Sequence, residues 1–414
     1  MSPACVYERV RLIARLHRLP RAAAALVIVG LAFFLTPSLS HAEFRVIETA
    51  NVRLIYYGQV QGYIASHVAR CVENSLAFHR QLFHWEPWEK IVVVMHDGSD
   101  YNNAGASTAP FNSISLAIAP PSYAFETTPA NERVNATMNH EVVHLVVNDR
   151  TAGLDGAFRR VFFGKVRETD EHPETILYSY LTGPRRSAPR WYQEGIAVFM
   201  ETWMAGGLGR ALGSYDEMVF RTLVRDSATI YDPVGLESEG TAADFQSGVN
   251  SYLYGTRFMS YLALAYGPDS LIRWVSRDKG SRSYYAAQFK RVYGVSLDRA
   301  WTEWIAWERQ YQQSNLERIR QYPVTRERVI SAAAPGSVSR GAYDVARGML
   351  FTAVNYPGDV AFIAGIEVST GRMHRICEVK GPALYFVTSL AYDSSTGTLF
   401  YTADNNDWRD LWSV

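Results

Sequence analysis

The sequence predicts an α+β fold with a helical second lobe and a C-terminal all-β segment. Three observations support this prediction. In residues 43–210, short runs with strand periodicity alternate with segments of helical periodicity. Residues 211–322 have helical periodicity almost throughout. In residues 323–414, a linker rich in Ala, Pro, Gly and Ser at 331–337 is followed by short strands separated by turn residues.

Length and composition indicate several domains and no global charge. At 414 residues the chain is long enough for two or three domains with separate cores. It is 48% hydrophobic and 20% charged, with 41 residues each of Lys+Arg and Asp+Glu. Because this balance creates no field that would attract polyanions, we do not expect a nucleic-acid partner.

Residues 1–42 have the pattern of a signal peptide. A basic stretch precedes an apolar run at 22–35, and Ser40 to Ala42 offers small residues where a signal peptidase reads them. The run is shorter than the roughly twenty residues of a membrane span. We expect cleavage before Glu43 and a periplasmic or secreted protein; transient or lasting membrane attachment through an uncleaved signal is the alternative. Cleavage would remove Cys5, and the remaining Cys71 and Cys377 are too few for a disulfide framework.

The region 43–210 is expected to form the α+β lobe. Its elements are, in order, a strand pair at 44–57, a helix at 62–83, a buried strand at 90–95, a polar loop at 97–108 and a strand at 113–119. Strict alternation in the last strand, which Pro120 and Pro121 close, predicts a half-exposed strand at the sheet edge.

A helix that carries two histidines follows this strand. Thr128 suits its N-cap, Pro129 suits the first helical position, and Glu132 adds negative charge near the positive end of the helix dipole. The periodicity fades after Asp149, so we expect a long loop. A second helix is expected from Pro189 to about Met204.

The all-β segment contains a weak repeat. Gly-Met-Leu-Phe-Thr from Gly348 recurs as Gly-Thr-Leu-Phe-Tyr from Gly397, 49 residues later. A period near fifty is typical of propeller blades, and the segment resembles the start of a TolB-like or WD-type β-propeller. Two copies cannot close a ring, so we expect an incomplete propeller that offers a surface to a protein partner, with a small β-sandwich as the alternative.

His140 and His144 are the central candidates for chemistry. Two histidines four residues apart lie on one face of a helix, so both rings can reach one metal ion, and zinc suits these ligands. Glu141 projects to the same side and can take a proton from a water that zinc acidifies. The sequence therefore predicts a zinc-dependent hydrolase site.

Such a site needs a third ligand. Arg150 stands where the metzincins place their third histidine, and arginine cannot bind zinc. Asp149, His172 and Glu194 remain as candidates. No glycine turn precedes Asp149 to reverse the chain. Glu194 lies on a second helix after a loop, which resembles the way gluzincin peptidases supply their carboxylate ligand.

A resemblance to a known family begins at Trp191. Trp-Tyr-Gln-Glu-Gly-Ile-Ala resembles the Trp-x-x-Glu-Gly-x-Ala segment of gluzincin zinc peptidases related to aminopeptidase N and leukotriene hydrolase. The resemblance implies a thermolysin-like catalytic fold, Glu194 as the third zinc ligand and Glu201 as the acceptor that orients a ligand histidine. Tyr-Leu-Tyr-Gly from Tyr252 is similar to the family's Tyr-x-x-Gly segment. That similarity implies Tyr252 as the tyrosine that stabilises the transition state, with Tyr254 as its rival.

One departure from the family bears on the substrate. The aminopeptidases carry Gly-x-Met-Glu-Asn on the edge strand, where the glutamate binds the substrate's amine, but residues 113–119 contain no carboxylate. An endopeptidase is therefore favoured over an exported aminopeptidase. We expect the edge strand, through Ser113, Ser115 and Ala117, to pair with an extended peptide or protein substrate. A non-catalytic envelope scaffold is the alternative from another class of function.

Overall fold

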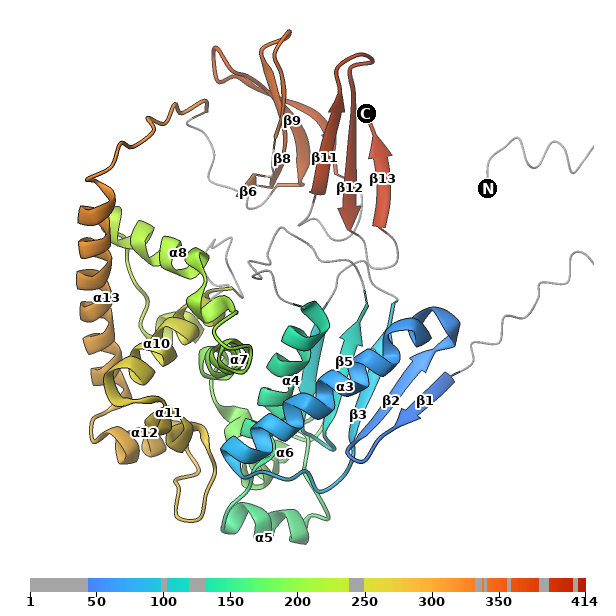
Figure 1. The fold of residues 1–414 in the computed structure, drawn as a ribbon, viewed down its shortest axis with the longest axis vertical. Coiled ribbons are helices and arrows are strands. Elements are labelled where there is room, and N and C mark those ends of the chain that lie inside the picture. The colour runs from blue at the N-terminus through green and yellow to red at the C-terminus, as the bar shows by residue number, and fades with distance from the viewer. Residues whose placement is uncertain are drawn as a thin grey trace, which may run out of the picture. The chain divides into compact units, whose positions relative to one another are not determined.

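The computed structural model describes most of the chain from Phe44 onward (Figure 1). The described residues are 44–97, 103–118, 132–237, 249–331, 337–338, 341–355, 359–379, 387–404 and 409–414. The expected signal peptide lies outside them. Within these ranges no helix is long and apolar enough to cross a membrane.

The α+β part is built on a five-stranded mixed sheet in the order β1-β2-β3-β5-β4. Strand β2 pairs in parallel with β3, and β3 with β5, whereas β4 is antiparallel to β5. The strands are β1 (Phe44–Glu48), β2 (Val52–Tyr57), β3 (Ile91–His96), β4 (Ala104–Ser107) and β5 (Ser113–Ala117). The predicted strand pair at 44–57 and the buried strand at 90–95 are confirmed.

The prediction that residues 113–119 form the edge strand is wrong. Strand β4 covers β5 along its length, from the Ala104↔Leu116 pair to the Ser107↔Ser113 pair. Ser113, Ser115 and Ala117 therefore do not offer a free backbone edge. Strand β4 was missed because its sequence, Ala-Gly-Ala-Ser, has no apolar alternation and lies in the expected polar loop.

Helices α3 (Gly58–Phe83) and α4 (Arg133–Asp149) pack against each other on the sheet (Figure 1). Helix α3 contacts β2 and β3, and α4 contacts β4. Glu132 is the N-cap of α4, where its carboxylate accepts hydrogen bonds from the Val134 and Asn135 amides. The helix thus begins at Arg133, and the expected start at Thr128 and Pro129 lies outside the described residues.

The expected long loop before Pro189 contains helices. They are α5 (Leu154–Val161), α6 (Thr175–Thr182) and a short 3-10 turn η1 (Pro184–Ser187). The prediction failed because each helix is at most eight residues long, too short for a clear apolar period. The next helix, α7 (Arg190–Met204), matches its predicted range.

A helical lobe follows α7, as predicted. Its elements are η2 (Arg210–Leu212), α8 (Ser214–Arg225), α9 (Pro233–Glu237), α10 (Asn250–Tyr266), α11 (Pro268–Val275), α12 (Tyr285–Tyr293) and α13 (Leu297–Ile319). One buried apolar cluster runs from Val52 in the sheet through Val142 in α4 to Trp304 in α13. The sheet and the helical lobe therefore share a core, which fixes α7 between them.

The crossing of α7 and α10 depends on two glycines. A Cβ on Gly195 would lie 2.7 Å from the Gly255 Cα, and a Cβ on Gly255 would overlap the Trp191 carbonyl oxygen. Only residues without a side chain allow the two backbones to approach so closely. These are the glycines of the two segments that resemble gluzincins, so the resemblance has a packing reason.

The C-terminal part contains two separate sheets. One holds β6 (Ser337–Val338), β7 (Ala342–Asp344), β8 (Met349–Asn355), β9 (Phe362–Glu367) and β10 (Met373–Glu378). The other holds β11 (Val387–Asp393), β12 (Thr398–Asp404) and β13 (Arg409–Ser413).

The 49-residue repeat corresponds to two equivalent hairpins. Asp344 pairs with Met349 in one hairpin as Asp393 pairs with Thr398 in the other, and Gly348 and Gly397 have positive φ angles of 62° and 76°. The two sheets share one buried apolar cluster, which includes Phe351 and Tyr401. No closed propeller forms among the described residues, so the propeller prediction is not supported. The alternative, a small β-sandwich, stays a prediction.

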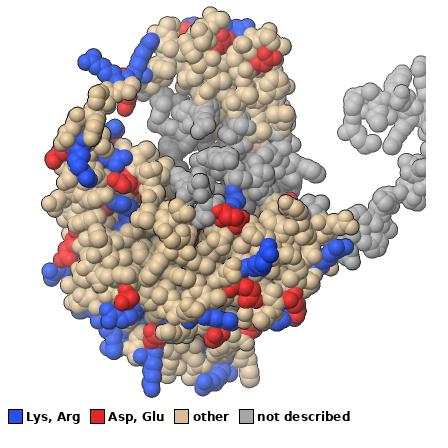
Figure 2. Space-filling model, in the orientation of Figure 1, with Lys and Arg blue, Asp and Glu red and all other residues tan. Residues whose placement is uncertain are grey.

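Charged side chains of both signs are interspersed on the visible face (Figure 2). This distribution agrees with the equal numbers of acidic and basic residues. Cys71 and Cys377 are both free thiols.

Gly255→Ala is expected to destabilise the protein by about 3 kcal/mol, because the added methyl group forces α7 and α10 apart. Gly156→Ala is a matched control in a helix: a Cβ there meets only the Thr151 hydroxyl, at 3.7 Å. We expect the control to change stability by no more than about 1 kcal/mol. Urea unfolding measures both, and equal stability of the two variants would contradict the proposed packing.

Candidate active site

Helix α4 separates its apolar face from its polar face. Met138, Val142 and Leu145 are fully buried in the core. His140 and His144, one turn apart, lie on the other side, where their rings are 4.8 Å apart between centroids. The apolar face thus anchors the helix while both imidazoles face α7.

The three predicted ligands converge. His140 Nε2 and His144 Nε2 are 3.1 Å apart, and Glu194 Oε2 lies 3.2 Å from the first and 3.4 Å from the second. Around a tetrahedral zinc ion, nitrogen and oxygen ligands are about 3.3 Å apart, given bonds of about 2.0–2.2 Å. The three atoms therefore have the spacing of one face of a zinc coordination sphere, and they could hold a metal ion.

A pair of side-chain amides fixes α7 against α4 beside this cluster. Asn148 Nδ2 donates to Gln193 Oε1 at 3.1 Å, and Gln193 Nε2 donates to Asn148 Oδ1 at 3.0 Å. Gln193 precedes Glu194, and Asn148 lies one turn after His144. This reciprocal pair therefore sets the register in which the Glu194 carboxylate meets the two histidines.

Glu141 is buried beside the cluster, with 5% of its surface exposed. Its Oε2 atom has no hydrogen-bond partner within the described part of the chain. Burial raises the pKa of Glu141, although the neighbouring His140 and His144 act in the opposite direction. A buried carboxylate with a free oxygen and a raised pKa suits a group that must accept a proton and release it again.

Glu201 lies beside the first histidine. Its Oε2 atom lies 2.8 Å from His140 Nδ1. If His140 Nε2 bound a metal, the proton of the ring would be on Nδ1, and this N–H would donate a hydrogen bond to Glu201. Burial alone would raise the pKa of Glu201, but Arg210 and His140 lower it to about 2. Glu201 is thus an ionised acceptor at every pH at which the protein is expected to work.

Arg210, in η2, was missed by the sequence analysis. Its Nε and Nη2 atoms donate to the two oxygens of Glu201, each at 2.7 Å, and Nη2 lies 3.0 Å from His140 Nδ1. A bidentate pair of this kind fixes the carboxylate plane as well as its charge. No sequence pattern points to Arg210, because it meets His140 only through the fold, 70 residues along the chain.

Hydrogen bonds shift the pKa values of two candidate metal ligands, His140 and Glu194. Burial disfavours a charged imidazole, yet the hydrogen bonds of His140 to Glu194 and Glu201 raise its pKa to about 10. Burial also opposes ionisation of Glu194, but His140 and His144 hold its pKa well below the usual value. A cation at the centre of the three atoms would take the place of the proton on His140.

The two candidate tyrosines have different surroundings. The Tyr252 ring stacks near His140, 6.2 Å between centroids, and the Arg190 and Arg210 guanidinium groups lie 5.5 and 5.4 Å from its centroid. Tyr254 is buried in the core of the helical lobe, where its hydroxyl accepts a hydrogen bond from the Tyr231 amide. Of the two tyrosines, only Tyr252 lies beside His140.

The other proposed ligands lie elsewhere. Asp149 is buried in ion pairs with Arg159 and Lys165, at 3.0 and 2.9 Å. His172 is exposed and lies 3.5 Å from Glu174. Neither belongs to the group formed by His140, His144 and Glu194.

Comparisons with known proteins add little to this geometry. No family model matches the chain, and no curated protein matches it. One similar solved structure is an aminopeptidase N family protein from Idiomarina loihiensis, at 11% identity and a TM-score of 0.32. The alignment covers 90% of this chain and spans 66% of the other protein's length.

Arg210→Met is expected to weaken zinc binding roughly 10- to 100-fold, because Glu201 loses the charge that keeps it ionised and oriented toward His140. Competition with a chromophoric chelator measures the affinity. Arg221→Met, which removes an arginine of α8 paired with Glu217, is the control and should bind zinc like the wild type. Unchanged affinity in a folded Arg210→Met protein would show that Arg210 has no part in the site.

Proposed function

We propose that this chain is an exported zinc peptidase of the gluzincin type, with His140, His144 and Glu194 as zinc ligands. The observation that carries the proposal is the meeting of three ligand atoms within 3.1–3.4 Å of one another beside a buried carboxylate, Glu141. A purely structural metal site has no need of this fourth group.

Each residue has a distinct part in the proposed reaction. Bound zinc supplies Lewis-acid chemistry, which acidifies a water molecule and polarises the scissile carbonyl. Glu141 takes the proton of the attacking water and returns it to the leaving amine. Its raised pKa makes it a stronger base for the first of these steps. The Tyr252 hydroxyl donates a hydrogen bond to the developing oxyanion. Burial raises the pKa of Tyr252, so the hydroxyl stays protonated.

The substrate surface is assigned to β4 rather than β5. Strand β4 is the last of its sheet among the described residues and packs against α4. Gly105 at its centre is exposed, and a Cβ there would meet no atom within 4 Å. An extended peptide can add to such an edge through backbone hydrogen bonds alone.

Strand β4 also bears on the kind of peptidase. Its residues, Ala-Gly-Ala-Ser, contain no carboxylate that could bind a free amino terminus. Recognition through the backbone does not require a chain end. We therefore favour cleavage within a peptide chain.

Glu141→Gln is expected to retain stoichiometric zinc and to lower the rate of peptide cleavage roughly 100- to 10,000-fold, because the amide cannot accept the proton of the water. Mass spectrometry of products from a diverse peptide pool measures the rate, and elemental analysis measures zinc. The matched control is Glu303→Gln, which should cleave like the wild type. Glu303 lies on α13, where it pairs with Arg299. Full activity of Glu141→Gln would refute the proposed base.

The same peptide pool distinguishes the alternatives. Acetylated and free peptides should be cut equally at internal bonds, because the proposed binding uses the substrate backbone. Removal of single residues from free amino termini only would identify an aminopeptidase instead. A protein that binds no zinc when zinc is supplied, and that cleaves no peptide, would be a non-catalytic scaffold.

A further inference from the structure

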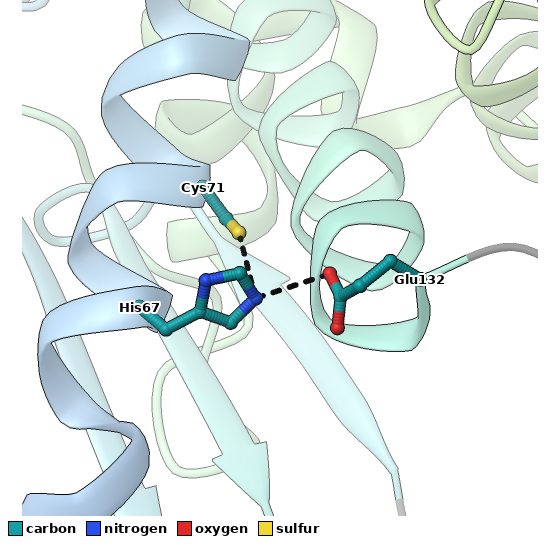
Figure 3. A group of neighbouring side chains, drawn as sticks. All are labelled: His67, Cys71 and Glu132. Carbon is teal, nitrogen blue, oxygen red and sulfur yellow. Dashed lines mark hydrogen bonds and ion pairs between the residues drawn. The ribbon is translucent and has the colours of Figure 1, made fainter.

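A second cluster of potential metal ligands lies at the other end of α4. His67 and Cys71 are one turn apart on α3, and Glu132 is the N-cap of α4, where both elements meet (Figure 3). His67 Nε2 points toward both partners: it is 3.6 Å from Cys71 Sγ and 3.2 Å from Glu132 Oε2. All three ligand atoms lie within 4.8 Å of one another.

The two distances from His67 Nε2 match those of a tetrahedral zinc site. With bonds of about 2.3 Å to sulfur and about 2.0–2.1 Å to nitrogen and oxygen, the ligand atoms would be about 3.5 Å apart for sulfur and nitrogen and about 3.3 Å apart for nitrogen and oxygen. The observed values are 3.6 and 3.2 Å. Imidazole, thiolate and carboxylate are moreover the three ligand types that zinc accepts in proteins.

Glu132 can bind a cation without giving up its capping role. Its Oε1 accepts from the Val134 amide at 3.1 Å and its Oε2 from the Asn135 amide at 2.7 Å. Each carboxylate oxygen has a further lone pair, so these bonds leave Oε2 able to face His67 as well. The amides also fix the carboxylate in place, as partners of a metal ligand usually do.

The three side chains of the cluster differ in their exposure to solvent. Cys71 is 3% exposed, whereas the side chains of His67 and Glu132 are 39% and 50% exposed. A cation can therefore approach from the solvent side and meet the sulfur at the bottom.

We propose that His67, Cys71 and Glu132 bind a second zinc ion, which joins α3 to the first turn of the helix that carries His140 and His144. The site is independent of the proposed peptidase activity, since none of its ligands belongs to the active-site cluster. Its metal stabilises the start of α4 by linking the N-cap to a helix packed on the sheet.

Cobalt titration of the full chain, after removal of bound metal by a chelator, tests this proposal. A cobalt–thiolate bond gives a near-ultraviolet charge-transfer absorption that nitrogen and oxygen ligands do not give. Wild type should take up two equivalents of cobalt and show this absorption. Cys377→Ser removes the other free thiol of the described part of the chain and should behave like the wild type. Cys71→Ser should lose the absorption and one equivalent.

Two further variants separate the two sites and guard against misfolding. His144→Ala should bind one equivalent fewer yet retain the thiolate absorption, so failure of the peptidase site would not be confused with failure of this one. His67→Asn changes a half-exposed side chain, should fold normally by circular dichroism and should weaken the absorption strongly. A wild type without thiolate absorption, or absorption lost in Cys377→Ser and kept in Cys71→Ser, would overturn the proposal.

Discussion

The position of α7 against α4 is the constraint on which the candidate active site depends. Two ligands come from one helix and the third from the other, so a small shift between them would separate the three atoms. The Asn148–Gln193 amide pair sets the register on one side, and the contact of Gly195 with Gly255 fixes α7 from the opposite side. Packing that looks unrelated to chemistry therefore determines the spacing of the ligands.

Buried charge is the second feature of the site. His140, Glu194, Glu201 and Arg210 are all largely withdrawn from water, and each would be costly to bury alone. They occur as one network in which every charge has an opposite neighbour. Glu141 is the exception, because one of its oxygens has no partner among the described residues. Such an unsatisfied group in an otherwise compensated network is typical of a residue kept for function rather than for stability.

Local patterns were sufficient to predict the group of candidate ligands and the main helices, but not the contacts made across the fold. The i, i+4 spacing and the segment around Glu194 were sufficient because helical periodicity is a local property. Strand β4 was not predicted, because its own residues have no strand pattern. It is a strand only through its pairing with β5. Arg210 and the group around Cys71 were also missed, since each joins elements distant in sequence. The two C-terminal hairpins show the opposite case, in which the sequence repeat predicts equal local structure but not how many units the domain contains.

The central claim is that α4 and α7 together bind one zinc ion, and anomalous scattering at the zinc edge from crystals grown with zinc tests it most directly. We expect an anomalous-scattering peak about 2.0–2.2 Å from Nε2 of His140, from Nε2 of His144 and from a carboxylate oxygen of Glu194. A well-ordered structure with no zinc at this position, or with zinc bound there by other side chains, would contradict it.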